Sequence, residues 1–222
     1  MNEIKEIYKD INPENMAYFE EFNIRKNILK ELNFINEDNT LTIKGKAARE
    51  INTTDCVIIT EILISDIFMK LSDDEIVAFL SGFVTNKNQI ELNYPKISEN
   101  LNEAYLKFLD IYEKIKNEEE KNNFEENKYN RRFLPDVSMA IKSWMEGAPF
   151  GEICKLTDLE EGKLYNLILR IFLFLEEIFN FYSVLGNIKE STRFDNIKNS
   201  LLRGIMGVQS LYLQDKINID LK

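Results

Sequence analysis

Apolar residues recur along most of this chain at the three- and four-residue spacing of helices, and they are densest within residues 157–187. Between positions 164 and 175 the only polar residues are Asn166 and Arg170. This pattern predicts a long helix. Because a helix that is apolar on nearly all sides belongs inside a bundle, we expect other helices to surround it.

Both ends of this predicted helix carry recognisable signals. Thr157 and Glu160 have the spacing of a capping box, which marks a helix start before an apolar run. Gly186 and Asn187 both tolerate the left-handed conformation that is common at helix C-termini. The sequence therefore predicts a helix that begins at the threonine cap and ends at Gly186.

The polar exceptions on this helix share one edge. Lys163, Asn166, Arg170 and Glu177 follow one another at intervals of three, four and seven residues. Two interpretations fit: the edge meets water at a gap between neighbouring helices, or it lines a groove for a ligand. A membrane span is excluded, since any apolar window of about 20 positions is interrupted by Asn166, Arg170, Glu176, Glu177 and Asn180.

The remaining patterns predict an all-α bundle with one small exception. Residues 40–43 and 46–51 have the pattern of two short strands about a turn at Gly45, as at the end of a winged-helix domain. Residues 36–39 and 86–97 have turn and loop chemistry, and 117–128 is a solvated helix end or a loop. Further helices are predicted at 13–34, 54–71, 72–83, 101–115, 135–147, 150–156 and 194–212. Ser72 and Glu75 have the spacing of a second capping box. The 101–115 helix has a heptad-like apolar stripe at positions 101, 104, 105, 108, 112 and 115.

Composition and charge narrow the possible functions. The formal net charge is −10 with a pI near 4.8, so no general basic field attracts nucleic acid. The chain has no histidine, and Cys56 and Cys154 are too few for a tetrahedral metal site. Two free thiols are expected, although a disulfide is conceivable. No phosphate-binding glycine loop is present, and we nominate no catalytic residue, so the chain is not assigned as an enzyme by itself.

One segment resembles a DNA-reading motif in outline. Residues 150–169 predict a short helix, a tight turn and a long helix. A recognition helix needs a basic first turn, whereas Asp158, Glu160 and Glu161 occupy this one. Their carboxylates repel phosphate, so DNA is not an expected partner.

Three blocks of sequence resemble a known family. Residues 44–51 (KGKAAREI) and 59–63 (ITEIL) resemble the opening of the C-terminal helical DSHCT domain of exosome-associated DExH RNA helicases. Residues 144–150 (WMEGAPF), 153–158 (ICKLTD) and 161–162 (EG) are similar to that domain's central motif. Residues 210–213 (SLYL) resemble its typical end. The ICKLTD block and the ending are closer to the Mtr type than to the Ski type.

The resemblance implies an organisation and a set of partners. Residues 1–52 correspond to the end of an arch or winged-helix region, 53–213 to the helical bundle, and 214–222 to a polar tail. The implied function is a non-catalytic module of an ATP-dependent 3′-to-5′ RNA helicase, with RecA-like ATPase domains, single-stranded RNA, the exosome and adaptor proteins as partners. This chain then needs no cofactor, since ATP and magnesium bind the RecA-like domains. The implied location is the nucleus, with the cytoplasm as the alternative.

The resemblance also implies a site. Residues 157–187 match the family's ratchet helix, and Arg170 matches an arginine that the family places against RNA; Asn166 and Lys163 share its edge. The family usually has basic residues around Asn166 and Leu169 and a carboxylate at Leu173, so the grip on RNA is expected to be weaker or differently tuned. The alternative function is an acidic helical module that binds proteins and never contacts RNA.

Overall fold

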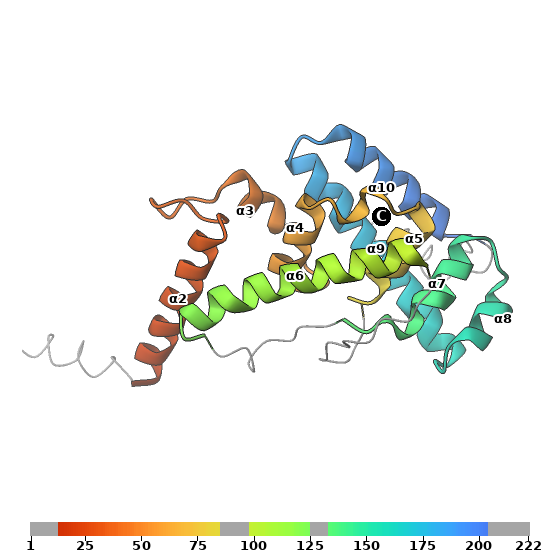
Figure 1. Ribbon diagram of the computed structural model, residues 1–222, viewed down its shortest axis with the longest axis horizontal. Helices are drawn as coiled ribbons and strands as arrows, with labels where there is room; N and C mark the ends of the chain where they lie inside the picture. Colours follow the sequence, from red (N-terminus) through yellow and green to blue (C-terminus); the bar gives the residue numbers. More distant parts are fainter. Residues whose placement is uncertain (1–12, 85–97, 125–132, 204–222) are drawn as a thin grey trace, which may run out of the picture.

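The computed structural model describes residues 13–84, 98–124 and 133–203, which form an all-α fold without strands (Figure 1). Within these ranges, short 3-10 turns connect some of the helices: η1 (Ile67–Met69), η3 (Pro135–Val137) and η4 (Cys154–Leu156). The helices in chain order are α2 (Pro13–Glu31), α3 (Ile43–Ala48), α4 (Cys56–Ile64), α5 (Asp73–Ser81), α6 (Glu99–Lys121), α7 (Ser138–Met145), α8 (Phe150–Ile153), α9 (Glu161–Val184) and α10 (Ile188–Leu201).

Side-chain caps explain where several of these helices begin. The Asp55 carboxylate accepts hydrogen bonds from the first backbone N–H groups of α4, which have no partner inside the helix. The predicted capping box of Ser72 and Glu75 is confirmed at the start of α5. Glu75 also accepts a 2.6 Å hydrogen bond from the Ser98 hydroxyl at the start of α6, so one carboxylate ties two helix starts together.

The core contains a cluster of aromatic rings between α5, α6 and the segment that enters η3. Phe79, Phe83, Phe108 and Phe133 are all fully buried, and their ring centroids lie 4.7 to 6.2 Å apart. Offset and edge-on pairs at these distances add to the free energy gained by burial. The predicted apolar stripe of α6 faces this cluster and is confirmed, because its residues from Leu101 to Ile115 are buried at the expected spacing.

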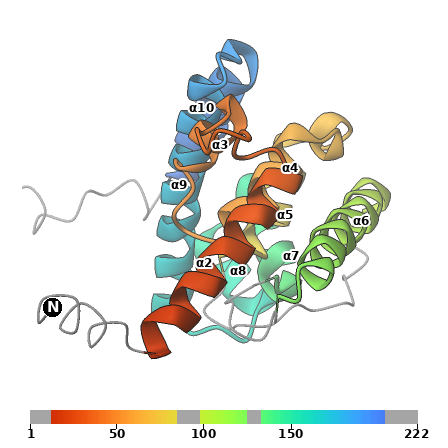
Figure 2. The same cartoon turned by 90° about the vertical axis from the view of Figure 1, so that its left-hand side faces the viewer.

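The prediction that other helices surround the long helix is too strong. Figure 2 shows α9 along one side of the described part, with α6 on the other side. α9 packs against α10, α3 and α5. Its buried face runs from Leu164 to Tyr182, whereas Leu173 in the middle of the apolar run is 58% exposed. The helix therefore buries one wide face and leaves an edge open.

The two predicted strands at 40–43 and 46–51 are wrong. Residues 43–48 form the helix α3, and residues 35–41 form an isolated antiparallel bridge between Ile35 and Leu41 and no strand. The predicted turn at 36–39 lies inside that bridge and is confirmed by the hydrogen bond from the Asn36 N–H to the Thr40 carbonyl. The bridge is too short to support the winged-helix assignment, which stays a prediction.

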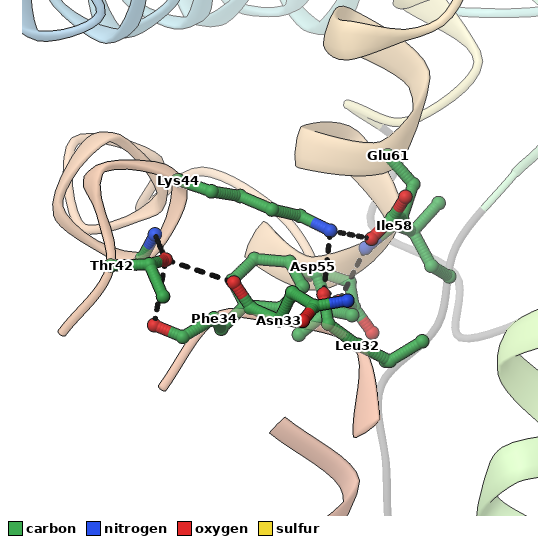
Figure 3. Close-up of polar contacts among 10 residues, drawn as sticks. Leu32, Asn33, Phe34, Thr42, Lys44, Asp55, Ile58 and Glu61 are labelled. Atoms are coloured by element: carbon green, nitrogen blue, oxygen red, sulfur yellow. Dashed lines mark hydrogen bonds and ion pairs between the residues drawn. The ribbon is translucent and has the colours of Figure 1, made fainter. Parts of the chain in front are cut away.

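A polar network fixes α3 onto its neighbours (Figure 3). The Thr42 hydroxyl caps the start of α3, because it accepts a hydrogen bond from the Gly45 N–H. The same hydroxyl donates to the Phe34 carbonyl. The Lys44 ammonium donates to the Leu32 carbonyl at 2.7 Å and pairs with the Glu61 carboxylate of α4. The short helix α3 has little apolar surface, and these hydrogen bonds connect it to residues 32–34 and to α4.

Several predictions fall outside the described residues. These are the loop at 86–97, the end of the helix predicted at 194–212, the 210–213 block and the tail at 214–222. The domain boundaries at 52/53 and 213/214 also stay predictions. The predicted 150–156 helix is confirmed as α8 followed by η4.

Candidate nucleic-acid interface

The helix α9 exists as predicted, but it starts only at Glu161, beyond the position that the predicted capping box indicates. Thr157 has an extended backbone, and its hydroxyl accepts a 3.3 Å hydrogen bond from the Leu159 N–H rather than capping a long helix. Glu160 is the residue that precedes the first turn, and its side chain makes no cap. The predicted end is confirmed, since Gly186 has a φ of +72° just after the last turn.

The three candidate residues lie on one edge of the N-terminal half of α9. Lys163 and Asn166 are exposed and Arg170 is half-buried, so none of them is sealed in the core. The Lys163 ammonium lies 3.2 Å from the Glu160 carboxylate in an exposed ion pair. The structure therefore brings the candidates together on an accessible surface, with Arg170 as the deepest cation.

The other end of the predicted polar edge is closed. The Glu177 carboxylate accepts from the backbone N–H groups of Asn52 and Thr53 at 3.0 Å and from the Thr53 hydroxyl at 2.9 Å. These bonds dock the segment before α4 onto α9. Glu177 is consequently a structural residue, and the edge available to a ligand ends before it.

Leu173 is part of the same open edge, although polar residues alone did not indicate it. It follows Arg170 by three positions and Asn166 by seven, which places it on the same side of the helix. The adjoining Leu169 is half-buried against the core. Helical spacing alone could have included Leu173, had apolar residues been considered as ligand contacts. We call Lys163, Asn166, Arg170 and Leu173 the open edge of α9.

The nearby cation Lys198 contributes to the packing of α10 against α9. The Lys198 ammonium of α10 lies 2.9 Å from Asp195 and 3.4 Å from Glu176. It also lies 5.8 Å and 5.4 Å from the ring centroids of Phe172 and Phe179 of α9. Burial of this ammonium would lower its pKa, but the hydrogen bond to Asp195 and the charge of Glu176 outweigh burial and raise the pKa. Lys198 thus stays charged and holds α10 against the back of α9.

The described residues limit other kinds of chemistry. Cys56 and Cys154 are free and half-buried, and burial raises the pKa of both thiols, so neither is an activated nucleophile. Within residues 13–84, 98–124 and 133–203, no group of three or more Cys, Asp or Glu side chains could hold a metal ion. In the same ranges, no helix has the length and apolarity needed to cross a membrane.

Comparison with known proteins identifies related sequences along nearly the whole chain. The mRNA transport homolog 4 of Caenorhabditis elegans is 31% identical over 218 residues, which cover 96% of this chain and 20% of that protein. The ATP-dependent RNA helicase mtr4 of Schizosaccharomyces pombe is 26% identical over 216 residues, or 96% of this chain and 19% of that protein. The human exosome RNA helicase MTR4 is 29% identical over 196 residues, which cover 87% of this chain and 19% of that protein.

The chain thus spans about a fifth of the length of these curated relatives. Residues 38–209, more than three quarters of the sequence, match the DSHCT (NUC185) domain. This range contains α3 to α10 and therefore the whole open edge of α9. The expected family is confirmed, and the chain belongs to the DSHCT domain family of exosome-associated DExH RNA helicases.

Proposed function

We propose that this chain is the non-catalytic C-terminal helical module of an ATP-dependent 3′-to-5′ RNA helicase, which guides single-stranded RNA toward the exosome in the nucleus. Membership of the DSHCT family supports this proposal, as do the names of the relatives, which describe RNA helicases. ATP and magnesium would bind RecA-like domains elsewhere in a longer protein. In this role α9 is the ratchet-like helix, and α2 belongs to the end of a winged-helix domain.

The observation that carries the proposal is the accessible edge of α9 with Arg170 at its centre. A guanidinium is planar and always charged, so it can stack on a base or pair with a phosphate of a passing strand. The edge lies on the side of α9 that α10 does not cover, since α10 packs near Phe172, Glu176 and Phe179. A strand could therefore reach Arg170 without moving α10.

Fluorescence anisotropy with the full 222-residue chain and a labelled single-stranded oligoribonucleotide tests this proposal. We expect weak binding, with a Kd within about 10⁻⁴–10⁻⁶ M, as for other nonspecific contacts. Arg170→Ala should weaken binding about tenfold, the effect of losing one stacked or charged contact. Arg25→Ala is the matched control, because it removes the same charge from α2, at the opposite end of the molecule from the start of α9 (Figure 1).

Two results would count against the proposal. The first is RNA affinity that falls equally for both arginine variants, which would indicate a general charge effect and no site on α9. The second is the absence of RNA binding together with binding of a RecA-domain fragment, which would favour the acidic protein-binding module.

A further inference from the structure

The short helix α3 presents two exposed cations on one face. Lys46 and Arg49 are three residues apart, so they lie one turn apart, and both side chains are exposed. Arg49 follows the last residue of α3 and keeps a helical backbone, with φ −64° and ψ −19°. Within the part of the chain that the structure describes, neither side chain has an ion-pair or hydrogen-bond partner. Both charges are therefore available to a ligand.

The surroundings of α3 are positive, although the whole chain carries a formal charge of −10. Lys44, Lys46 and Arg49 share their segment with a single carboxylate, the half-buried Glu50. The Glu61 carboxylate of α4 is the acidic group that reaches α3 from its neighbour, and it pairs with Lys44. The two exposed cations thus outnumber the one remaining carboxylate. An anion that most of this acidic chain repels is attracted here.

α3 lies where the open edge of α9 ends. Figure 2 shows α3 beside α9, with α6 on the other side of the described part. The segment after α3 is fastened to α9, because the backbone N–H groups of Asn52 and Thr53 donate to the Glu177 carboxylate at 3.0 Å. Arg49 is three residues before Asn52, so the two Cα atoms lie within about 11 Å of each other. A strand that leaves the open edge toward Glu177 therefore reaches the cations of α3 next.

The open edge itself offers few charges to a phosphate backbone. Lys163 is paired with Glu160, which leaves Arg170 as the other cation between positions 163 and 173. Proteins that hold a strand by its phosphates use several Lys and Arg contacts. Residues one helical turn apart have Cβ atoms about 5–6 Å apart, so the two side chains of α3 can contact neighbouring phosphates.

We infer, on the basis of the proposed function, that Lys46 and Arg49 of α3 bind the phosphate backbone of the RNA strand beyond the open edge of α9. Phosphates carry no sequence information, so this contact lengthens the bound strand without selecting its bases. It also makes affinity depend on salt, because each neutralised phosphate releases counterions. An acidic protein segment is the competing ligand, since Ile43 on the same helix is an exposed apolar residue.

The test measures anisotropy of the full 222-residue chain with a labelled single-stranded oligoribonucleotide between about 50 and 200 mM salt. The α3 double variant, Lys46→Gln with Arg49→Gln, removes both charges. Each phosphate contact contributes about 0.7 to the slope of log affinity against log salt, so the slope should become shallower by about 1.4. Referred to about 1 M salt, affinity should fall about tenfold at 200 mM and about 70-fold at 50 mM.

The α6 double variant, Lys114→Gln with Lys121→Gln, is the matched control. It removes the same two charges from exposed side chains of α6, across the described part from α3 (Figure 2). It should leave both the affinity and the salt slope nearly unchanged. Urea midpoints should equal that of the wild type for both double variants, since surface substitutions change stability by about 0.5 kcal/mol or less.

The outcomes separate this inference from the proposed function. If the Arg170 and Arg25 variants differ but the two double variants behave alike, the inference is wrong and the proposed function stands. The inference also fails by itself if the α3 double variant weakens binding without changing the salt slope, because the contact is then not to phosphate. Loss of binding to a RecA-domain fragment with unchanged RNA binding would identify α3 as a protein contact and overturn the inference. If the wild-type chain binds no RNA, both fail.

Discussion

Replacement of Gly45 by alanine tests the packing of α3 most directly. A Cβ atom at this position would lie 2.1 Å from the Phe34 carbonyl oxygen and 3.2 Å from Leu41 Cδ2. The oxygen is not free to retreat, because it accepts the Thr42 N–H at 3.0 Å and the Thr42 hydroxyl at 3.1 Å (Figure 3). The clash is with backbone, so no side-chain rotation relieves it.

The expected loss of stability follows from three contributions. Moving the carbonyl by about 1 Å breaks a hydrogen bond worth about 1 kcal/mol. Overpacking of a tight contact costs about 1–3 kcal/mol more. The higher helix propensity of alanine offsets about 0.5–1 kcal/mol. We therefore expect Gly45→Ala to lower the free energy of unfolding by about 1–3.5 kcal/mol.

Urea denaturation followed by circular dichroism measures this change. With an m-value of about 2–3 kcal/mol/M, the midpoint should fall by about 1 M. Gly162→Ala is the control, because a Cβ there meets no atom within 4 Å in the first turn of α9. It should leave the midpoint unchanged or raise it slightly. Equal midpoints for the two variants would refute the close approach of α3 to the Phe34 carbonyl.

Two further predictions concern carboxylates. Glu177→Ala leaves two backbone N–H groups before α4 without their acceptor, so we expect the free energy of unfolding, measured by urea denaturation, to fall by about 1–3 kcal/mol. Glu161 is exposed, and Glu161→Ala is the control, which should change the free energy of unfolding by less than about 0.5 kcal/mol. Burial would raise the pKa of Asp74, but hydrogen bonds from the Lys142 ammonium and the Ser72 hydroxyl outweigh burial and lower the pKa. A lowered pKa stabilises the folded protein at pH values above the pKa of the unfolded chain, about 3.9, and this stabilisation is lost as the pH falls through the pKa of the folded state. Asp74→Asn should therefore flatten the decline of the urea midpoint between about pH 5 and 3. An unchanged decline would show that this carboxylate is not linked to folding.

Local sequence signals located most helices because the responsible groups are close together in the chain. The Ser72–Glu75 box, the heptad of α6 and the Gly186 stop all act within one or two turns. The start of α9 is the exception. Thr157 has the right spacing for a cap, but its backbone ends η4 in an extended conformation, so the helix begins only at Glu161.

The error at 40–51 has a definite physical cause. The sequence pattern predicts Gly45 in a turn, whereas Gly45 is a helical residue with no left-handed backbone. Its lack of a side chain serves the close approach of α3 to Phe34, a contact between segments that are separated by a turn in the chain. Thr42, three residues before Gly45, is the cap that could have indicated a helix. A glycine can be required by a close backbone contact as well as by a turn. Only the neighbouring segment in the folded structure distinguishes these two reasons.

The extent of the open edge of α9 also depends on a contact between residues distant in the sequence, and this extent limits the affinity for RNA. Spacing places Lys163, Asn166, Arg170 and Glu177 on one edge, but only a contact with Asn52, 125 residues away, reveals that the Glu177 end is covered. The edge that remains, from Lys163 to Leu173, is about 15 Å long at about 1.5 Å per residue. So short a surface can touch only a few nucleotides, which limits the binding energy that α9 supplies by itself. Tight RNA binding in a longer protein must therefore come from additional surfaces, and submicromolar binding by this chain alone would place RNA contacts beyond the open edge of α9.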